Sequence, residues 1–252
     1  MELVVDNNHL GRSEAQWKDS GHLDILTDLD LSARRIIIVA PHPDDEVLGA
    51  GGLIQAALSS DISVEVVAVT DGEGSHPFSK VTGDLDLAAV RSRESYVALR
   101  RLGWVEPRIT TLHLPDGKVE QRRAELDEAL AKMVQTGDLL VAPWRRDGHP
   151  DHDACGESAL AVSRAAGAKA IGYLVWAWHW AEPDGTDIPW RYCQRLNMSQ
   201  RARARKRWAT GAFQSQTSPI GPDAADGPVL PAPIMRRFWR SYEVFVDEMA
   251  VT

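Results

Sequence analysis

The stretch Ile36-Ile-Ile-Val-Ala-Pro-His-Pro-Asp-Asp-Glu-Val-Leu-Gly-Ala-Gly-Gly52 decides the fold of this chain. Its opening β-branched run, residues 36–39, is continuous rather than alternating, which is typical of a strand buried on both faces of a parallel sheet. Prolines, a histidine and three carboxylates follow at once, and a helix is expected from about Val47 to Leu58. Because the ligands of open α/β sheets collect at the carboxyl ends of the strands, this polar cluster indicates a functional site.

Two side chains in the cluster have the spacing and the chemistry of a metal site. His42 and Asp45 lie three residues apart on a tight turn between strand and helix, so both can point at one spot. An imidazole nitrogen and a carboxylate oxygen are both ligands of zinc. A purely structural interpretation competes with this one, because Pro43 suits the first turn of a helix and the carboxylates of Asp44 and Glu46 suit its positive end.

A second cluster, Asp147-Gly-His-Pro-Asp-His-Asp153, repeats this construction. It follows the apolar strand candidate Leu139–Pro143 and precedes another expected helix. Adjacent parallel strands lie about 5 Å apart, so the two strand ends can bring His42, Asp45 and His152 around a single metal ion. One coordination position then remains for water, as hydrolytic zinc sites require. Two clusters of the same construction favour this shared site over separate capping roles.

The two motifs together resemble those of a known family. His42-Pro-Asp-Asp-Glu46 and His149-Pro-Asp-His152 are similar to the signature of the PIG-L/LmbE-like zinc-dependent N-deacetylases, which act on N-acetylglucosamine conjugates. The resemblance covers about residues 34–218 and extends to three weaker motifs, which are Thr70-Asp-Gly-Glu73, Arg91-x-x-Glu94 and Leu114-Pro-Asp-Gly117. It implies a single α/β domain with a Rossmann-like, three-layer αβα arrangement around a mostly parallel sheet. The strand and helix patterns that alternate along the chain agree with this fold class.

The resemblance also implies roles for individual residues. The three predicted metal ligands would hold zinc, and Asp44, which lies between two of them in the sequence, would be the general base. His149 is placed to stabilise the oxyanion, with acid catalysis as a further role. Asp147 and Asp151 are expected to orient the imidazoles of the site.

Three more residues are expected to contact the substrate because they match substrate-binding positions of the family: Glu73, Arg91 and Asp116. Two of them also have a structural interpretation. Arg91 can form an ordinary surface pair with Glu94 on one helix face, and Asp116 can be a turn residue in front of a glycine. The sequence leaves both choices open.

The sequence therefore predicts a zinc-dependent hydrolase that removes an N-acetyl or other N-acyl group from an N-acetylglucosamine-type sugar conjugate. Zn²⁺ activates water and polarises the amide carbonyl, and Fe²⁺ also fits two histidines and a carboxylate with an open position. Two alternatives use the same residues: a metal-dependent amidase or esterase acting on a natural-product or thiol conjugate, and a family member that binds a sugar without catalysis. A nucleotide-binding domain, suggested by Gly49-x-Gly-Gly52, is disfavoured because these glycines fall inside the expected helix.

Composition places the chain among ordinary soluble globular proteins. Of its 252 residues, 44% are hydrophobic and 25% are charged, which is enough to build a large core. The net charge of −8 argues against a nucleic-acid partner, and no apolar stretch approaches the roughly 20 residues of a membrane span. The N-terminus lacks the pattern of a signal peptide, and the two cysteines have no metal-ligand spacing. We expect a cytoplasmic enzyme with a small-molecule amide substrate; the sequence leaves the oligomeric state open.

Three segments are expected along the chain. Residues 1–33 are predicted to form an N-terminal extension that packs on the surface, and residues 34–218 the deacetylase domain. Residues 219–252 are predicted to be a Pro/Gly-rich loop and a terminal element that packs on the same domain. The basic run Arg201–Arg207 is expected to be a solvated helix face, and His76 is expected to lie at the surface.

Overall fold

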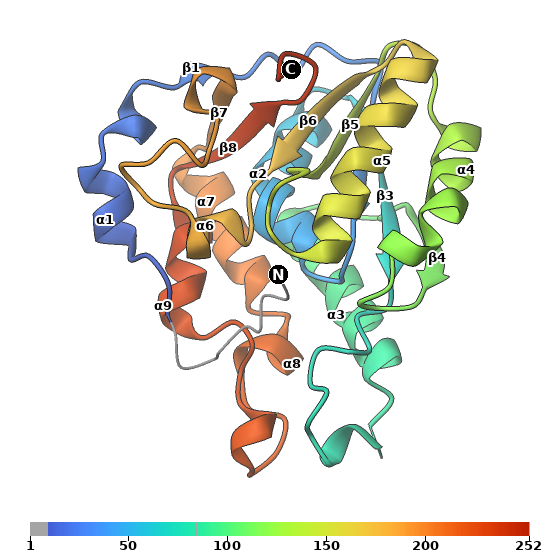
Figure 1. Cartoon of the computed structure of the whole chain (residues 1–252), viewed down its shortest axis with the longest axis vertical. Helices are drawn as coiled ribbons and strands as arrows, with labels where there is room; N and C mark the ends of the chain where they lie inside the picture. The colour runs from blue at the N-terminus through green and yellow to red at the C-terminus, as the bar shows by residue number, and fades with distance from the viewer. Residues whose placement is uncertain (1–9, 84, 252) are drawn as a thin grey trace.

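Within the residues that the structure describes, eight strands form one sheet in the order β1-β7-β8-β6-β5-β2-β3-β4 (Figure 1). The computed structural model describes residues 10–83 and 85–251. The strands are β1 (Thr27–Asp28), β2 (Arg35–Ala40), β3 (Ser63–Thr70), β4 (Ile109–Leu114), β5 (Asp138–Pro143), β6 (Lys169–Tyr173), β7 (Cys193–Asn197) and β8 (Tyr242–Asp247). Neighbouring strands are parallel except where β8 pairs with β6 and β7. The predicted mostly parallel α/β sheet is confirmed.

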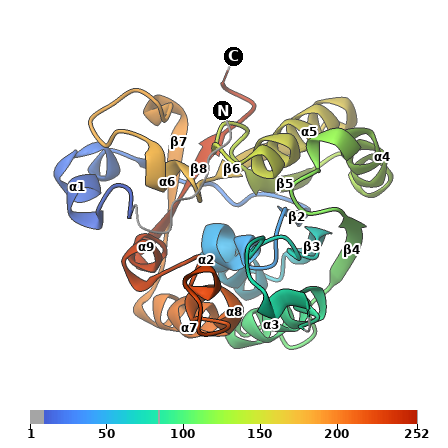
Figure 2. The same cartoon turned by 60° about the horizontal axis from the view of Figure 1, so that its bottom comes forward.

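Helices cover both faces of the sheet, which gives the predicted three-layer arrangement (Figure 2). Helices α2, α3 and α7 pack on one another on one face, and α4 and α5 cover the other. The α-helices are α1 (Glu14–Asp19), α2 (Asp45–Ser59), α3 (Leu87–Leu102), α4 (Arg123–Met133), α5 (Pro150–Ala166), α6 (Ala177–Trp180), α7 (Gln200–Thr210), α8 (Gln214–Thr217) and α9 (Ala232–Met235).

Strand β2 shows why the continuous apolar run forms the centre of this fold. Ile36 and Ile38 belong to the core under α2, α3 and α7, whereas Ile37 and Val39 belong to the core under α4 and α5. All four side chains are fully buried. Successive side chains of a strand point to opposite faces, so a strand with helices on both sides needs apolar residues at every position.

The order of the strands reverses between β2 and β5. From β2 the chain proceeds outward through β3 to β4, and then returns to β5 on the other side of β2. The helices that follow the two strands therefore leave to opposite faces, α2 to one and α5 to the other. Such a reversal leaves a crevice at the carboxyl ends of the two strands, where open α/β sheets bind their ligands.

Helix α2 is kinked at Ala50, where φ is −134° and ψ is 16°. The glycines around the kink allow close packing rather than phosphate binding. A Cβ atom on Gly49 would lie 2.1 Å from the ring of Tyr173, whose hydroxyl donates a hydrogen bond of 2.9 Å to the carbonyl of Val39. The Gly49-x-Gly-Gly52 pattern thus reflects the contact of α2 with the sheet.

A buried ion pair between Lys206 of α7 and Glu243 of β8 fills the kink. The Glu243 carboxylate accepts hydrogen bonds from the backbone N–H groups of Gly52 (2.5 Å) and Leu53 (2.9 Å), and Lys206 Nζ donates to the carbonyl of Leu48 at 2.7 Å. The two charges are 2.6 Å apart. The prediction of a solvated face for residues 201–207 is therefore wrong at Lys206, because the kink exposes backbone groups that need buried partners.

Both ends of the described chain contribute to the fold. The side chain of Trp17 is fully buried, and its indole N–H donates to the carbonyl of Trp178 at 3.0 Å. Strand β1 pairs with β7, and β8 lies between β6 and β7. The predicted boundaries after residues 33 and 218 stay a prediction. No described helix is long and apolar enough to cross a membrane.

We expect Lys206→Met to lower the free energy of unfolding by about 3–5 kcal/mol, because it leaves the Glu243 carboxylate buried without its cation. Urea denaturation measures the loss. The matched control is Arg201→Met on the exposed side of the same helix, which should change stability by less than about 0.5 kcal/mol. Equal losses in the two variants would show that the ion pair does not stabilise the kink.

Candidate metal centre and active site

The two predicted clusters meet at the carboxyl ends of β2 and β5. His42 and Asp45 follow β2, and His152 lies in the first turn of α5. Asp45 Oδ2 is 3.2 Å from His42 Nδ1 and 3.2 Å from His152 Nε2. Asp45 also accepts a hydrogen bond of 3.0 Å from the backbone N–H of His42, which fixes the turn. Asp45 Oδ2 therefore lies between the two imidazoles, while the role of the three side chains as metal ligands stays a prediction.

The surroundings of His152 suit a metal ligand. The side chain is fully buried, and its Nδ1 lies 2.8 Å from Asp147 Oδ2. Its Nε2 is turned toward Asp45 and has no hydrogen-bond partner among the described residues. An imidazole that gives one N–H to a carboxylate and keeps the lone pair of its other nitrogen free is the usual form of a metal-binding histidine. These residues therefore fit a divalent cation.

Asp147 is itself held by the backbone, as expected for a residue that orients an imidazole. Its carboxylate accepts hydrogen bonds of 2.9 Å from the N–H groups of Val175, Trp176 and Ala177. The side chain is fully buried. With both oxygens engaged by fixed donors, Asp147 holds the ring of His152 in one orientation.

Two groups of described side chains have donor atoms close enough together to hold a cation; both contain His42 and neither contains Asp45. Nitrogen atoms of His42, His149 and His152 lie within 4.8 Å of one another, and so do donor atoms of His42, Asp116 and Asp151. On its Nε2 side, His42 has Asp116 Oδ1 at 3.1 Å and Asp151 Oδ2 at 3.3 Å. The sequence could not show this second group, because Asp116 approaches from the loop after β4.

The site carries an excess of buried negative charge. Arg91 is the only Lys or Arg among the cavity-lining side chains in the part of the chain that the structure describes. Burial would lower the pKa of His152, but Asp45 and Asp147 raise it to about 9. Burial would likewise raise the pKa of Asp45, yet His152 and His42 hold it well below its usual range. The carboxylates thus favour a positive charge between them, which either protons or a metal ion can supply.

Asp44 adopts a backbone conformation that is rare for residues other than glycine, with φ of +143°. Such strain costs about 1–3 kcal/mol and needs support from the surroundings. Arg91 supplies it by donating to Asp44 Oδ2 (3.2 Å) and to the carbonyls of Pro43 (3.0 Å) and Gly72 (2.6 Å). Burial raises the pKa of Asp44 to about 8, with Arg91 opposing the rise and neighbouring carboxylates adding to it. A carboxyl group with a pKa near neutrality suits proton transfer.

The surface-pair interpretation of Arg91 is wrong. Its side chain is only 3% exposed, and Glu94 instead accepts hydrogen bonds from the backbone N–H (2.8 Å) and the hydroxyl (2.6 Å) of Ser215. Arg91 lines the cavity, as a substrate contact would. Because its guanidinium already holds the Asp44 turn, its predicted contact with substrate stays a prediction.

His149 lines the cavity, and a backbone hydrogen bond assigns the tautomer of its neutral ring. Burial, together with the nearby His42 and His152, lowers its pKa to about 3. Its Nδ1 accepts a hydrogen bond of 3.2 Å from the backbone N–H of Asp151, so the proton of the neutral ring is on Nε2. His149 therefore offers an N–H donor to the cavity, which suits the predicted stabilisation of an oxyanion.

Glu73 and Asp116 occupy different positions relative to the cavity. Asp116 lines the cavity, and its Oδ2 accepts a hydrogen bond of 2.8 Å from the backbone N–H of Gly74. Glu73 is exposed and lies outside the cavity lining; its carboxylate accepts from the backbone N–H of Asp116 at 3.0 Å. The structure thus places Glu73 where it positions Asp116. The direct contact of either residue with substrate stays a prediction.

Asp151 joins the loop after β4 to the metal site. Its two oxygens accept hydrogen bonds from the backbone N–H groups of Gly117 (2.7 Å) and Val119 (3.0 Å). The same carboxylate lies against His42 Nε2. It therefore contacts an imidazole, as predicted for an orienting residue, although the imidazole belongs to the other cluster.

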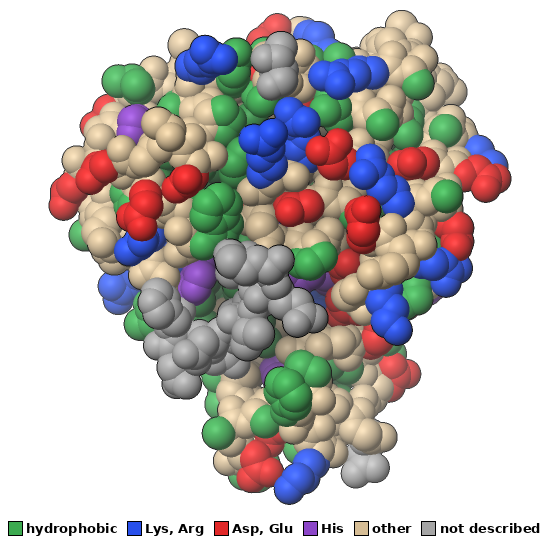
Figure 3. Space-filling model, in the orientation of Figure 1, with side chains coloured by type: hydrophobic (Ala, Val, Ile, Leu, Met, Phe, Trp, Pro, Cys, Tyr) green, Lys and Arg blue, Asp and Glu red, His purple; other side chains and the backbone are tan. Residues whose placement is uncertain are grey.

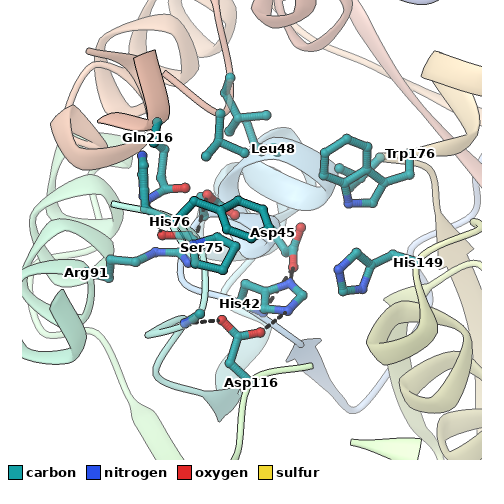
Figure 4. Close-up of a pocket in the computed structure, with 18 residues that line it drawn as sticks. His42, Asp45, Leu48, Ser75, His76, Arg91, Asp116, His149, Trp176 and Gln216 are labelled. Atoms are coloured by element: carbon teal, nitrogen blue, oxygen red, sulfur yellow. Dashed lines mark hydrogen bonds and ion pairs between the residues drawn. The ribbon is translucent and has the colours of Figure 1, made fainter. Parts of the chain in front are cut away.

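The site opens into a cavity of about 550 Å³ (Figure 4). Figure 3 shows a hollow between the lower projection of the molecule and its body, with histidine side chains visible near it. His76 lines this cavity and is only 4% exposed, so the expected surface position is wrong. Its Nδ1 is 2.9 Å from the hydroxyl of Ser75, to which Gln216 also donates at 3.3 Å. The sequence of a loop after a strand suggests that the loop is exposed to solvent. Residues 218–230 cover this loop, and they are far from it in the sequence.

Glu46 is a buried residue of the site region whose role the sequence did not reveal. Its carboxylate accepts hydrogen bonds from the hydroxyl of Ser95 (2.5 Å) and from the backbone N–H of Asp44 (3.0 Å). Burial raises its pKa to about 7. It therefore supports the strained turn from the side of the helix, through a partner on α3 that lies 49 residues away in sequence.

Comparisons with known proteins agree with this fold and site. A family model described as PIG-L, GlcNAc-PI de-N-acetylase, matches residues 37–163, half of the chain. The match spans both histidine clusters and the crevice between β2 and β5. The fold and the site thus define a Rossmann-like α/β protein with a histidine–carboxylate centre at its switch point. This chain belongs to the PIG-L family.

Several relatives are deacetylases of amino-sugar conjugates. The 1D-myo-inositol 2-acetamido-2-deoxy-alpha-D-glucopyranoside deacetylase of Corynebacterium glutamicum is 29% identical and matches 77% of this chain and 82% of its own length. The probable N-acetyl-alpha-D-glucosaminyl L-malate deacetylase 2 of Bacillus subtilis is 32% identical over 50% of this chain and 58% of its own. The structure of N,N'-diacetylchitobiose deacetylase from Pyrococcus horikoshii has the same fold, with a TM-score of 0.61, 22% identity and coverage of 93% and 92%.

We expect Asp147→Asn to weaken metal binding by about 10- to 100-fold, because the amide no longer fixes the His152 ring as a carboxylate does. Competition with a chromophoric chelator measures the affinity for Zn²⁺. The matched control is Asp153→Asn. Asp153 lies in the same segment, and its carboxylate accepts a hydrogen bond from the backbone N–H of Gly148 instead of orienting His152. If Asp147→Asn keeps its fold by circular dichroism and its affinity for Zn²⁺ is unchanged, Asp147 does not support metal binding.

Proposed function

We propose that this chain is a zinc-dependent N-deacetylase that removes an acetyl or other acyl group from an N-acylated amino-sugar conjugate. The observation that carries the proposal is the convergence of His42, Asp45 and His152 beside the buried carboxyl group of Asp44. Membership of the PIG-L family and the deacetylase names of the relatives support the same reaction. Fe²⁺ would suit the same ligands.

His42, Asp45 and His152 would hold the Zn²⁺ ion, which would lower the pKa of water toward about 7 and polarise an amide carbonyl. Asp44 accepts the proton of the attacking water, because its carboxyl group lies next to the ligands and lines the cavity. Arg91 keeps Asp44 in place through the hydrogen bond that it donates to Asp44 Oδ2. The attack makes a tetrahedral centre and places negative charge on the former carbonyl oxygen.

His149 stabilises that charge by donating its Nε2–H, as its tautomer allows. The C–N bond then breaks, and the proton held by Asp44 passes to the leaving amine. The products are the free amino sugar and a carboxylic acid, which then releases its proton to the amine or to solvent, so water supplies all the atoms that are added. Asp116, Ser75 and Gln216 give the cavity polar groups for sugar hydroxyls.

We expect Asp44→Asn to lower kcat by about 10²–10⁴, because it removes the general base. Metal content should stay at one equivalent, because Asp44 is not a ligand. Acetate release from N-acetylglucosamine conjugates measures the rate, and elemental analysis measures the metal. A variant that keeps the wild-type rate would exclude Asp44 as the base. Substrate binding without turnover in the wild-type protein would favour a sugar-binding role instead.

We expect His42→Ala and His152→Ala to lose both the metal and the activity, because each removes a ligand. Treatment of the wild-type protein with chelator should abolish acetate release, and Zn²⁺ should restore it. His22→Ala is the matched control, since His22 stacks on Trp190 and does not line the cavity. Activity that survives complete metal removal would overturn the proposed reaction.

A further inference from the structure

We propose that the substrate of this site carries an alkyl or aryl group beside its sugar, and that two loops of this chain bind it. The inference rests on the proposed function, which places the scissile amide at the histidine–carboxylate centre. The name apolar wall is used for six residues that line the cavity: Pro77, Phe78, Trp176, Ala225, Val229 and Leu230.

The cavity lining combines polar side chains with this apolar wall. The name polar floor is used for the cavity-lining residues of the two histidine clusters together with Asp116; they are His42, Asp44, Asp45, His149 and Asp116. Figure 4 shows Leu48 and Trp176 across the cavity from Asp116. A sugar with a small polar aglycone can satisfy the floor, but it leaves the wall in contact with water. A ligand that covers both parts must be amphipathic.

Five of the six wall residues come from two segments that project together from the lower end of the molecule (Figure 1), and Trp176 comes from the segment between β6 and α6. One follows β3 and carries Phe78; the other follows α8 and carries Val229 and Leu230. Ser79 Oγ donates a hydrogen bond of 2.6 Å to Asp226 Oδ1, and Asp226 is only 1% exposed. The backbone N–H of Leu230 donates to the carbonyl of Gln216 at 2.8 Å, which ties the second segment to α8. The two segments thus form one supported structure over the cavity.

Phe78 is the residue of the wall that most needs a partner. It lines the cavity and is 84% exposed, the highest value among the large apolar side chains of the described residues. An exposed phenyl ring at the rim of a cavity, next to Pro77 and Ala225, leaves an apolar surface that a bound apolar group would cover. Specificity for such a group follows from the wall, because the floor alone can distinguish only polar substituents.

The apolar group can belong to the acyl chain or to the aglycone, and two series of compounds distinguish these sources. In one, methyl glucosaminides carry N-acyl chains from acetyl to hexanoyl. In the other, N-acetylglucosaminides carry methyl, butyl, octyl or phenyl aglycones. We expect kcat/KM to rise about fourfold per added methylene in one series, the ratio that burial of one methylene gives. Flat or falling values in both series would overturn the inference.

Phe78→Ser tests the wall directly. The variant should lower the preference for the octyl or hexanoyl compound over its methyl or acetyl counterpart by about 10-fold or more, as loss of a buried phenyl contact predicts. Val105→Ser is the matched control, because Val105 is also an exposed apolar side chain but lies outside the cavity lining. An unchanged preference in Phe78→Ser would overturn the role of the wall.

Binding separates failure of this inference from failure of the proposed function. Trp176 lies in the wall, so tryptophan fluorescence reports the affinity for the methyl and octyl compounds and for the acetyl and hexanoyl compounds separately from turnover. Chelator-sensitive acyl release with equal affinity within both pairs would leave the deacetylase and remove the apolar specificity. Tighter binding of the octyl compound without any acetate release would support the wall and overturn the deacetylase.

Discussion

The parallel pairing of β2 with β5 is the constraint on which the rest of the structure depends. Because the chain leaves β2 toward one face and β5 toward the other, helices α2 and α5 diverge and leave a crevice at the carboxyl ends of the two strands. Each strand delivers one polar cluster to this crevice. The apolar cores on both faces fix the two strands, and through them the positions of the histidines.

Burial of so many charged groups requires that each has a partner, and the partners come from distant elements. Lys206 and Glu243 satisfy the backbone of α2 at its kink, while Arg91 and Glu46 support the strained turn at its start. The turn that carries His42 and Asp45 is therefore supported directly at the start of α2, and the helix behind it is supported at its kink. A buried polar network of this kind rigidifies a site only when its members are satisfied.

Residues after position 218 supply apolar cavity-lining groups that the two histidine clusters lack. The two histidine clusters and Asp116 form a polar floor, whereas Leu230 and its neighbours cover it from beyond residue 218. The family model matches residues 37–163, which include the polar floor. Four of the six wall residues, Trp176, Ala225, Val229 and Leu230, lie outside that match.

The sequence alone predicted the parallel sheet and the approach of His42 and Asp45 to His152, because continuous apolar runs and short spacings are local signals and each cluster directly follows a buried strand. Tertiary structure alone decided the burial of His76 and Lys206, the support of Asp44 by Arg91, and the approach of Asp116 to His42. These depend on contacts between residues far apart in the chain. A polar side chain in a loop or on a helix gives no sign of which distant element will bury it, because burial is a property of the packed elements and not of the residue.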